Sequence, residues 1–422
     1  MKDSVIKGNG NSRYLKSSLE GITTWEQFRA ALAAGTLPVD LNGINPDGFQ
    51  QLGDPLTKAS LLKDYTCGLL GLSSAAVPDD ALLALLIGVG YYGYRVKVQY
   101  TDGTPAEGVT VSGISALPGS SLVTGADGIA VGRSSSASVT INCTSPYIDQ
   151  KAPAAQVVTK TGTITDVTLT LENVTDMLTI ASSKTVKISP LAKTVDVTAV
   201  GGGGGGGGGI SNSYGGGGGG GGYITTELAV DLSKTTQISI LVGAGGLGAI
   251  TDSDPRPSDW HEASDGGNTT VQLSSKIISA SGGKKGESKL LGGSNQYVAA
   301  KGGAGNGSGG SGSLNLNDLK AFASDGKKAS GYIFNDPSLG IAGGGGGGGG
   351  GYINSSYSSI GANGGAPNGG TGTCQSTTNT NSNGKSFGGG GGGTDCKLDS
   401  AYGFGGAGGA GGVYLRFHFD AA

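Results

Sequence analysis

The chain has 422 residues, of which 87 are glycine and 36% are apolar, and its formal net charge is −3. This near-neutral balance, without a basic stripe or an arginine-rich tail, argues against a nucleic-acid partner. The longest apolar stretch, residues 81–89, is too short to span a bilayer, and the polar start Met1-Lys2-Asp3-Ser4 lacks a signal-peptide hydrophobic region. We therefore expect no membrane insertion, and synthesis in a cytoplasm.

Residues 1–93 are predicted to form a small helical region for attachment and oligomerisation. Thr24 and Gln27 make a capping box for a first helix, and a leucine-rich helix follows Pro78. That helix is apolar nearly all round, so it needs burial on several sides, which a small domain can hardly supply. This helix therefore predicts an oligomer interface or a docking site. The residues expected in the interface are Leu82, Leu83 and Leu86.

From Tyr94 the hydrophobic period changes to two, which is typical of β-strands. Asp102-Gly103 and Asp127-Gly128 mark turns between such segments. Several short strands at this spacing predict an antiparallel β-sandwich, prealbumin-like or Ig-like, as a spacer domain over residues 94–175. The sequence DGTPAEGVTV, with TGADG downstream, resembles prealbumin-like or carboxypeptidase-regulatory-type sandwich modules.

Four glycine runs decide the interpretation of residues 176–422; they cover residues 201–209, 215–222, 343–351 and 388–393. Glycine loses more backbone entropy on folding than any other residue and has no side chain to bury, so a conventional core would not select such runs. A flexible linker would be arbitrary in length. These runs instead have similar lengths and are followed by strand-like segments, which favours an ordered structure.

We expect the runs to form packed polyglycine II helices framed by β-strands. In this conformation a nine-residue run is a rod of roughly 28 Å with three residues per turn. Rods without side chains can approach closely and satisfy their backbone groups on one another. Collagen needs glycine at every third position together with abundant proline. This chain has only 13 prolines and none interrupts a run, so a collagen helix is excluded. Glycine is required where a Cβ would meet the next rod, and one residue represents each run: Gly205, Gly218, Gly347 and Gly390.

Two strands are predicted to frame the glycine-rich region. Residues 194–200 run directly into the first glycine run, and residues 413–419 follow the last glycine-rich segment, which admits Ala407 and Ala410. Both segments alternate in polarity, so they could pair. Residues 224–342 could cross the domain an unknown number of times, so the directions of the later runs stay open.

The order of these segments is TVDVTAVGGGGGGGGG, then GGGGGGGGYITTELAVDLSKTTQISILVGAGGLG, and finally GGAGGAGGVYLRFHF. It resembles the glycine-rich domain of bacteriophage tail fibres and tip adhesins and covers residues 176–422. The opening MKDSVIKGNGNSRYLKS, with FRAALAAGTLPVDLNGINPDGFQQLG, is similar to the amino-terminal portion of phage tail structural proteins. The resemblance implies a virion tail protein bound to other tail or baseplate proteins, a homotrimer, and a host-surface receptor such as a glycan or an outer-surface protein.

No catalytic, cofactor or metal site is predicted. Residues 88–93 fit the spelling G-x-G-x-x-G but precede a strand, so we interpret them as a hinge. Acidic pairs occur in loop-like sequence and lack the rigid frame of a glycoside hydrolase. Cys374 and Cys396 could bridge two loops, and a zinc site is disfavoured because His261 and His418 have no ligand-like spacing with them. His418 alternates within the last strand and is interpreted as a surface or edge residue.

Aromatic residues beside the runs or within polar loops are predicted receptor contacts, because rigid aromatics among Ser, Gly and Asn combine contact area with adaptable hydrogen bonds. The candidates are Tyr214, Trp260, Tyr357, Phe387, Tyr402 and Phe404. Tyr223 and Tyr352, each directly after a run, are interpreted as end-plugs of the lattice. The leading hypothesis is a non-enzymatic adhesin or fibre. The alternative is a purely structural fibre, head-fibre or decoration protein without receptor binding.

Overall fold

The computed structural model describes residue 87 and residues 90–117, 119–209, 216–252, 261–288, 300–315, 320–351, 360–372, 383–393 and 402–420. The helices predicted before residue 87, with their interface leucines Leu82, Leu83 and Leu86, lie outside the described residues. The expected mainly β fold with several antiparallel sheets is confirmed. Within the described ranges no helix is long and apolar enough to cross a bilayer.

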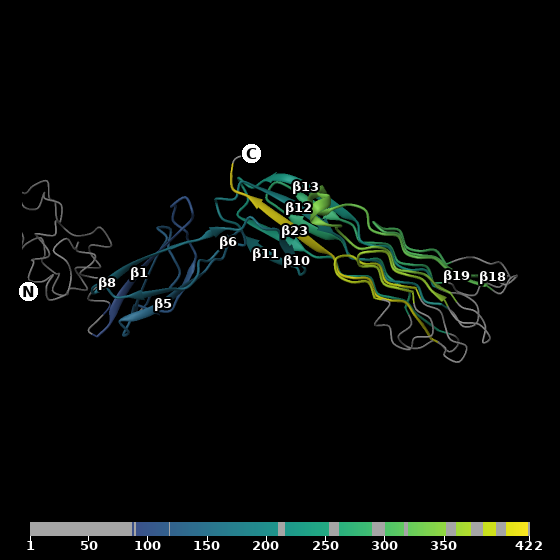
Figure 1. Cartoon of the computed structure of the whole chain (residues 1–422), viewed down its shortest axis with the longest axis horizontal. Helices are drawn as coiled ribbons and strands as arrows, with labels where there is room; N and C mark the ends of the chain where they lie inside the picture. Colours follow the sequence, from purple (N-terminus) through teal and green to yellow (C-terminus); the bar gives the residue numbers. More distant parts are fainter. Residues whose placement is uncertain are drawn as a thin grey trace, which may run out of the picture.

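The described part of the chain is elongated (Figure 1). The sandwich strands β1, β5 and β8 lie at one end of this part, and β12, β13 and β23 lie in the middle. The glycine-rich segments extend from these middle strands to the opposite end, where β18 and β19 lie.

The sandwich has two sheets. The first has the order β3-β4-β1-β8 and consists of β3 (Ser115–Ala116), β4 (Ile129–Ser134), β1 (Tyr92–Gln99) and β8 (Ile164–Thr170). The second has the order β2-β5-β7 and consists of β2 (Thr110–Ser112), β5 (Ser138–Thr144) and β7 (Gln156–Thr159). The expectation of purely antiparallel pairing is wrong for β1 and β8, which pair in parallel from Gly93 and Ile164 onward.

Alternation along β1 and β5 builds the sandwich core. Tyr94, Val96 and Val98 are fully buried, and they pack with Ile141 and Leu169 between the two sheets. The free Cys143 is buried in the same core, and burial raises the pKa of its thiol. A further short pair joins β6 (Gln150–Lys151) to β9 (Glu172–Asn173) where the sandwich meets the middle strands.

Two four-stranded sheets form the middle of the molecule. One has the order β10-β23-β12-β13, made of β10 (Leu178–Ile180), β23 (Gly412–His418), β12 (Thr194–Val200) and β13 (Ile224–Asp231). The other has the order β11-β14-β16-β17, made of β11 (Lys184–Lys187), β14 (Gln237–Leu241), β16 (Thr269–Gln272) and β17 (Ile277–Ala280). The two sheets share one core, to which Val197, Ile238 and Leu415 belong.

The expected pairing of the first and last framing strands is confirmed. β12 and β23 are antiparallel, from Thr194 opposite His418 to Val200 opposite Gly412. β12 is buried on both faces over most of its length because the second sheet and the 3-10 turn η3 (Ile333–Asn335) cover it. A second 3-10 turn, η4 (Pro337–Leu339), packs against η3.

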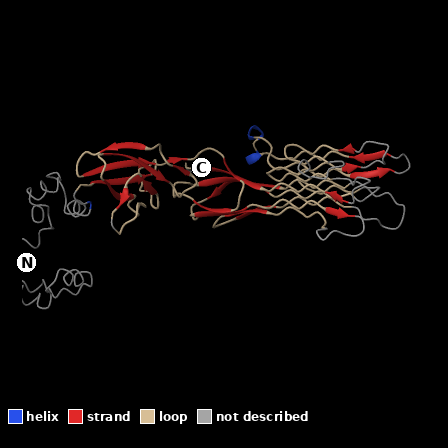
Figure 2. Ribbon diagram, turned by 90° about the horizontal axis from the view of Figure 1, so that it is seen from below, coloured by secondary structure: helices blue, strands red, loops and turns tan. Residues whose placement is uncertain are grey.

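Short strand pairs lie at the other end of the glycine-rich segments. They are β15 (Ile250–Asp252) with β22 (Tyr402–Phe404), β18 (Gly312–Asn315) with β19 (Lys320–Ala323), and β20 (Gly350–Gly351) with β21 (Ile360–Gly361). Figure 2 shows the tan glycine-rich segments running between the red middle sheets and these terminal strands. We call the end with these pairs the distal end and the end at the middle sheets the base.

Candidate functional site

The first glycine run, residues 201–209, is a rod enclosed by other segments. Its successive N–H groups donate in turn to three neighbouring segments, so every third residue donates to the same segment. These segments are residues 217–223, 264–267 and 406–409. Its carbonyl groups accept from residues in three further segments: 246–249, 283–286 and Gly391. A repeat of three with all bonds made to other rods is the arrangement of polyglycine II. Every residue of the run is buried.

The other runs are enclosed in the same way and bond to one another. Gly347 N–H donates to Gly219 O over 2.8 Å, and Gly219 N–H donates to Gly391 O over 2.7 Å. A Cβ added at any of the four representative positions would lie within 3.0 Å of a neighbouring backbone carbonyl. The carbonyls in question belong to Leu247 at Gly205, Gly347 at Gly218, Gly391 at Gly347, and Gly219 at Gly390. Side chains are therefore excluded from these inner rods.

Outer rods surround the glycine runs and carry side chains on their outward positions. Ala244 and Leu247 are exposed on one outer rod, and Lys284, Lys285 and Glu287 on another, while Gly246 and Gly286 between them are buried. Lys284 Nζ lies 2.8 Å from Asp265 on the adjacent rod, and both side chains are largely exposed. Such exposed ion pairs contribute little stability, so the backbone bonds hold the rods together.

Successive glycine-rich segments run toward the distal end and back to the base. The first run leaves β12 toward that end, and residues 216–222 return to β13. Residues 243–252 leave β14 in the same direction, and residues 261–268 return to β16. The sequence left the directions of the later glycine runs open, because the number of times that residues 224–342 cross the domain was unknown. Outer rods that carry side chains supply these additional crossings.

This array corresponds to a recognised family. A family model described as a glycine-rich domain matches residues 179–418, which is more than half of the chain. The chain belongs to this family. The match begins in β10 and ends in β23, so it covers the middle sheets and the array but not the sandwich. No curated protein matches the chain.

Two predicted receptor contacts come together at the distal end of the glycine-rich domain. In the pair β15 and β22, Tyr402 lies opposite Asp252 and Phe404 lies opposite Ile250. Ile250 also bridges to His261 with hydrogen bonds in both directions. His261 directly follows the candidate Trp260 in the sequence. The candidates Tyr214, Trp260 and Tyr357 lie outside the described residues.

The predicted receptor contact Phe387 packs against a small apolar cluster. It lies at the base of the glycine-rich domain, half-buried, with its ring centroid 5.1 Å from that of Tyr414 on β23. It packs in a small cluster with Val200 and Phe334. Gly412 is needed beside it, because a Cβ there would collide with the Phe387 ring. Packing against this cluster explains the position of Phe387.

The end-plug interpretation is also wrong for Tyr223. Its side chain is 38% exposed, and only its backbone joins the lattice, where its N–H donates to Ser281 O over 2.9 Å. The plug at the base is formed instead by η3, which places Ile333 and Phe334 against Val200. Tyr352 lies outside the described residues.

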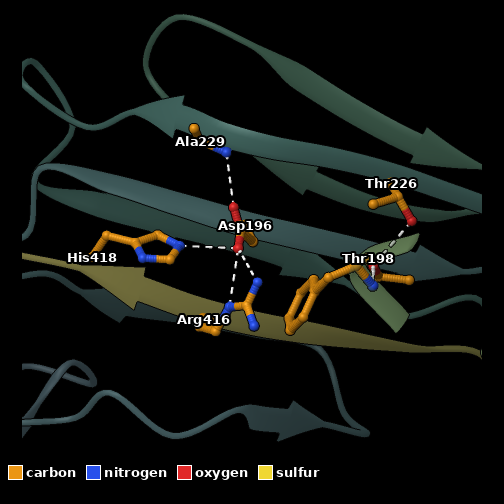
Figure 3. A network of polar contacts seen from close by, with 7 residues as sticks. Asp196, Thr198, Thr226, Ala229, Arg416 and His418 are labelled. Atoms are coloured by element: carbon orange, nitrogen blue, oxygen red, sulfur yellow. Dashed lines mark hydrogen bonds and ion pairs between the residues drawn. The ribbon is translucent and has the colours of Figure 1, made fainter. Parts of the chain in front are cut away.

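A polar network that the sequence analysis missed lies among the middle strands (Figure 3). Asp196 on β12 is 6% exposed, and its carboxylate accepts from Arg416 Nε at 3.0 Å and Nη2 at 2.7 Å. His418 Nε2 lies 2.9 Å from the same oxygen, and Ala229 N–H donates to the other oxygen over 2.8 Å. Burial alone would raise the pKa of the Asp196 carboxyl, but these hydrogen bonds outweigh it and hold the pKa below its usual value.

The network has a structural explanation. β12 and β13 shift register between Val195 and Val197, and Ala229 opposite this irregularity has a left-handed φ of 50°. Asp196 satisfies the backbone N–H of Ala229 at that bulge and ties β13 to β23. His418, expected at a surface or edge, is half-exposed and belongs to this network. Thr198 extends it by accepting from Phe334 N–H and lying 3.0 Å from the Thr226 hydroxyl.

Proposed function

We infer that the protein is a structural virion protein of a bacteriophage tail, either a fibre or an adhesin. In this role the amino-terminal region attaches to other tail or baseplate proteins, and the glycine-rich domain presents its distal end to a host-surface receptor. The receptor is a glycan or an outer-surface protein. The role requires binding and rigidity but no catalysis.

The observation that carries this proposal is the direction of the glycine-rich segments. The strands β12 and β23 lie together at the base, residues 201–209 and 243–252 run from the base toward the distal end, and residues 216–222 and 261–268 return from it. The polar, aromatic-containing sequences between these segments, with Tyr214 and Trp260, are thus connected to one end of a densely hydrogen-bonded frame. Binding residues are commonly carried by loops that a rigid scaffold positions, and Tyr and Trp supply contact area there at low entropic cost.

A purely structural fibre or decoration protein is the second candidate. It is favoured by the inner rods, whose residues are buried and whose backbone groups bond to neighbouring rods. Such a shaft would be stiff and resistant to proteases without binding anything at its end. The two candidates differ in whether the sequences at the distal end bind a receptor.

Cell binding separates the candidates. Purified, labelled protein is incubated with cells of the bacterium that the particle infects, and bound protein is measured against concentration. Saturable binding without sugar release is the expected result. Absence of binding would favour the structural fibre, and release of reducing sugars would overturn the non-enzymatic assignment.

The distal location is tested by tyrosine substitutions at the two ends of the domain. Tyr214→Ala with Tyr357→Ala is expected to weaken cell binding at least tenfold with an unchanged melting temperature, since neither residue is predicted to lie in a core. Tyr332→Ala is the matched control, because Tyr332 is also exposed but lies beside η3 at the base. Equal loss of binding by the control, or none by the double variant, would contradict a distal receptor site.

A further inference from the structure

The boundary between the sandwich and the glycine-rich domain is not a simple linker. A segment of the sandwich around Tyr147 lies beside the end of β11. Tyr147 forms a parallel bridge with Lys187, and Ile148 N–H donates to Lys187 O over 3.0 Å. Backbone pairing therefore crosses the boundary between residues that are far apart in sequence.

Asp149 is the centre of this joint and is fully buried. Its carboxylate accepts from the backbone N–H of Ser189 over 2.9 Å, from the Ser189 hydroxyl, and from Gln150 Nε2 over 3.3 Å. Its own carbonyl accepts from Val174 N–H over 2.9 Å. Asp149 thus joins the sandwich, the connection after β9, and the chain of the glycine-rich domain at Ser189.

Gln150 reinforces the same contact. It is 4% exposed, and Nε2 also donates to Asn173 Oδ1 over 3.0 Å and to the Ser189 hydroxyl over 3.2 Å. Buried polar groups lose their hydrogen bonds at a high cost when no water replaces them. Opening the joint would therefore have to expose Asp149 and Gln150 together.

Apolar side chains are exchanged across the boundary. Ile148, from the sandwich side, packs against the core of the middle sheets. Leu191, from the glycine-rich side, packs against the sandwich core. Each part therefore fills a site in the other, and rotation about the boundary would return both side chains to water.

We propose that this Asp149 joint locks the sandwich and the glycine-rich domain into one rigid body. The orientation of the distal end is then set by the sandwich, and a force or torque applied to one part passes to the other without bending. This inference goes beyond the proposed function, because it holds whether or not the distal end binds a receptor.

Rotational diffusion tests the proposal on the full chain. Nuclear magnetic resonance relaxation of backbone amides gives a correlation time for β1, β4 and β5 and another for β12 and β23. The expected result for the parent protein is a common correlation time. A shorter value for the sandwich strands in the parent would overturn the proposal without any variant.

Substitutions assign the rigidity to the joint. Asp149→Ala is expected to shorten the correlation time of the sandwich amides relative to those of the middle sheets, and Asp166→Ala is the control, because Asp166 forms an exposed ion pair with Arg95 on the sandwich surface. If Asp149→Ala does not fold, Ser189→Ala removes one donor from the same carboxylate and should produce the shortening. A folded joint variant that keeps the common correlation time would overturn the role of Asp149.

Discussion

Replacing Gly205 by alanine is expected to destabilise the glycine-rich domain, because the added methyl group has no space. The methyl carbon would lie within 3.0 Å of backbone atoms of Leu247 and Gly248 on an outer rod. These are main-chain atoms, so no rotamer change can remove the collision. The outer rod has to move away from the run at residues 201–209.

The magnitude follows from the bonds that this movement breaks. The same outer rod donates to the run through Gly246 N–H, 2.8 Å from Gly203 O, and Ala249 N–H, 2.9 Å from Gly206 O. Losing a buried hydrogen bond without replacement costs about 1–3 kcal/mol. Gly205 has no left-handed φ, so its backbone conformation is open to alanine. Alanine lowers the conformational entropy of the unfolded chain, which stabilises the folded protein by about 0.4–1 kcal/mol. The net destabilisation is about 1–5 kcal/mol, from the two lost bonds less this gain.

Calorimetry and limited proteolysis measure the effect. For a domain of this size, a loss of about 1–5 kcal/mol corresponds to a melting temperature lowered by roughly 2–20 °C. Gly162→Ala is the matched control, since a Cβ there would meet its nearest atom, Ile164 O, at 3.7 Å, an ordinary contact. If Gly205→Ala melts and resists protease like the parent while the control behaves normally, the close-packed arrangement at this rod is wrong.

Three further predictions concern the base, assembly and pH. Phe387→Ala should lower the melting temperature by removing about 2 kcal/mol of packing while leaving cell binding intact, and a loss of binding at full stability would restore it as a receptor contact. Leu83→Glu should convert the expected homotrimer into monomers or aggregates in sedimentation, and a monomeric parent would contradict the trimer. The folded pKa of Asp196 lies below its unfolded value of about 3.9, so its contribution is complete above about pH 4 and lost as pH falls through the folded pKa. Urea unfolding should therefore show a steeper loss of stability with acid in the parent than in Asp196→Asn, and identical pH profiles would refute the role of the carboxylate.

The framing strands and the inner rods could be predicted from the sequence, because both rest on local patterns. Alternation identified β12 and β23, and the purity of the runs at residues 201–209 and 343–351 indicated rods that exclude side chains. The outer rods were harder to predict. Their glycines alternate with residues such as Lys284 and Leu247, and their hydrogen bonds are formed between backbones, so the side chains do not encode which rod lies beside which.

Contacts between distant segments account for most of the remaining differences. Asp196 and Arg416 are 220 residues apart and meet because β12 and β23 pair with those two residues opposite each other. The pairing was expected, but its register was not, so the network could not be derived. The packing of Phe387 could not be derived for the same reason, since its partner Tyr414 lies on β23. The parallel pairing of β1 and β8 likewise depends on how the sandwich closes and not on either strand alone.

The outer rods give the protein a surface with a regular grid of substitutable positions. Exposed side chains recur every third residue on one rod, at Ala244 and Leu247, and fill two positions in three on another, at Lys284, Lys285 and Glu287; three residues of polyglycine II rise about 9 Å. The cohesion of the domain comes from backbone bonds, so charge, polarity and bulk can be exchanged on this grid without altering the interior. Surface chemistry and stability are thereby encoded at separate positions, which would let related chains diversify their flanks while keeping one frame.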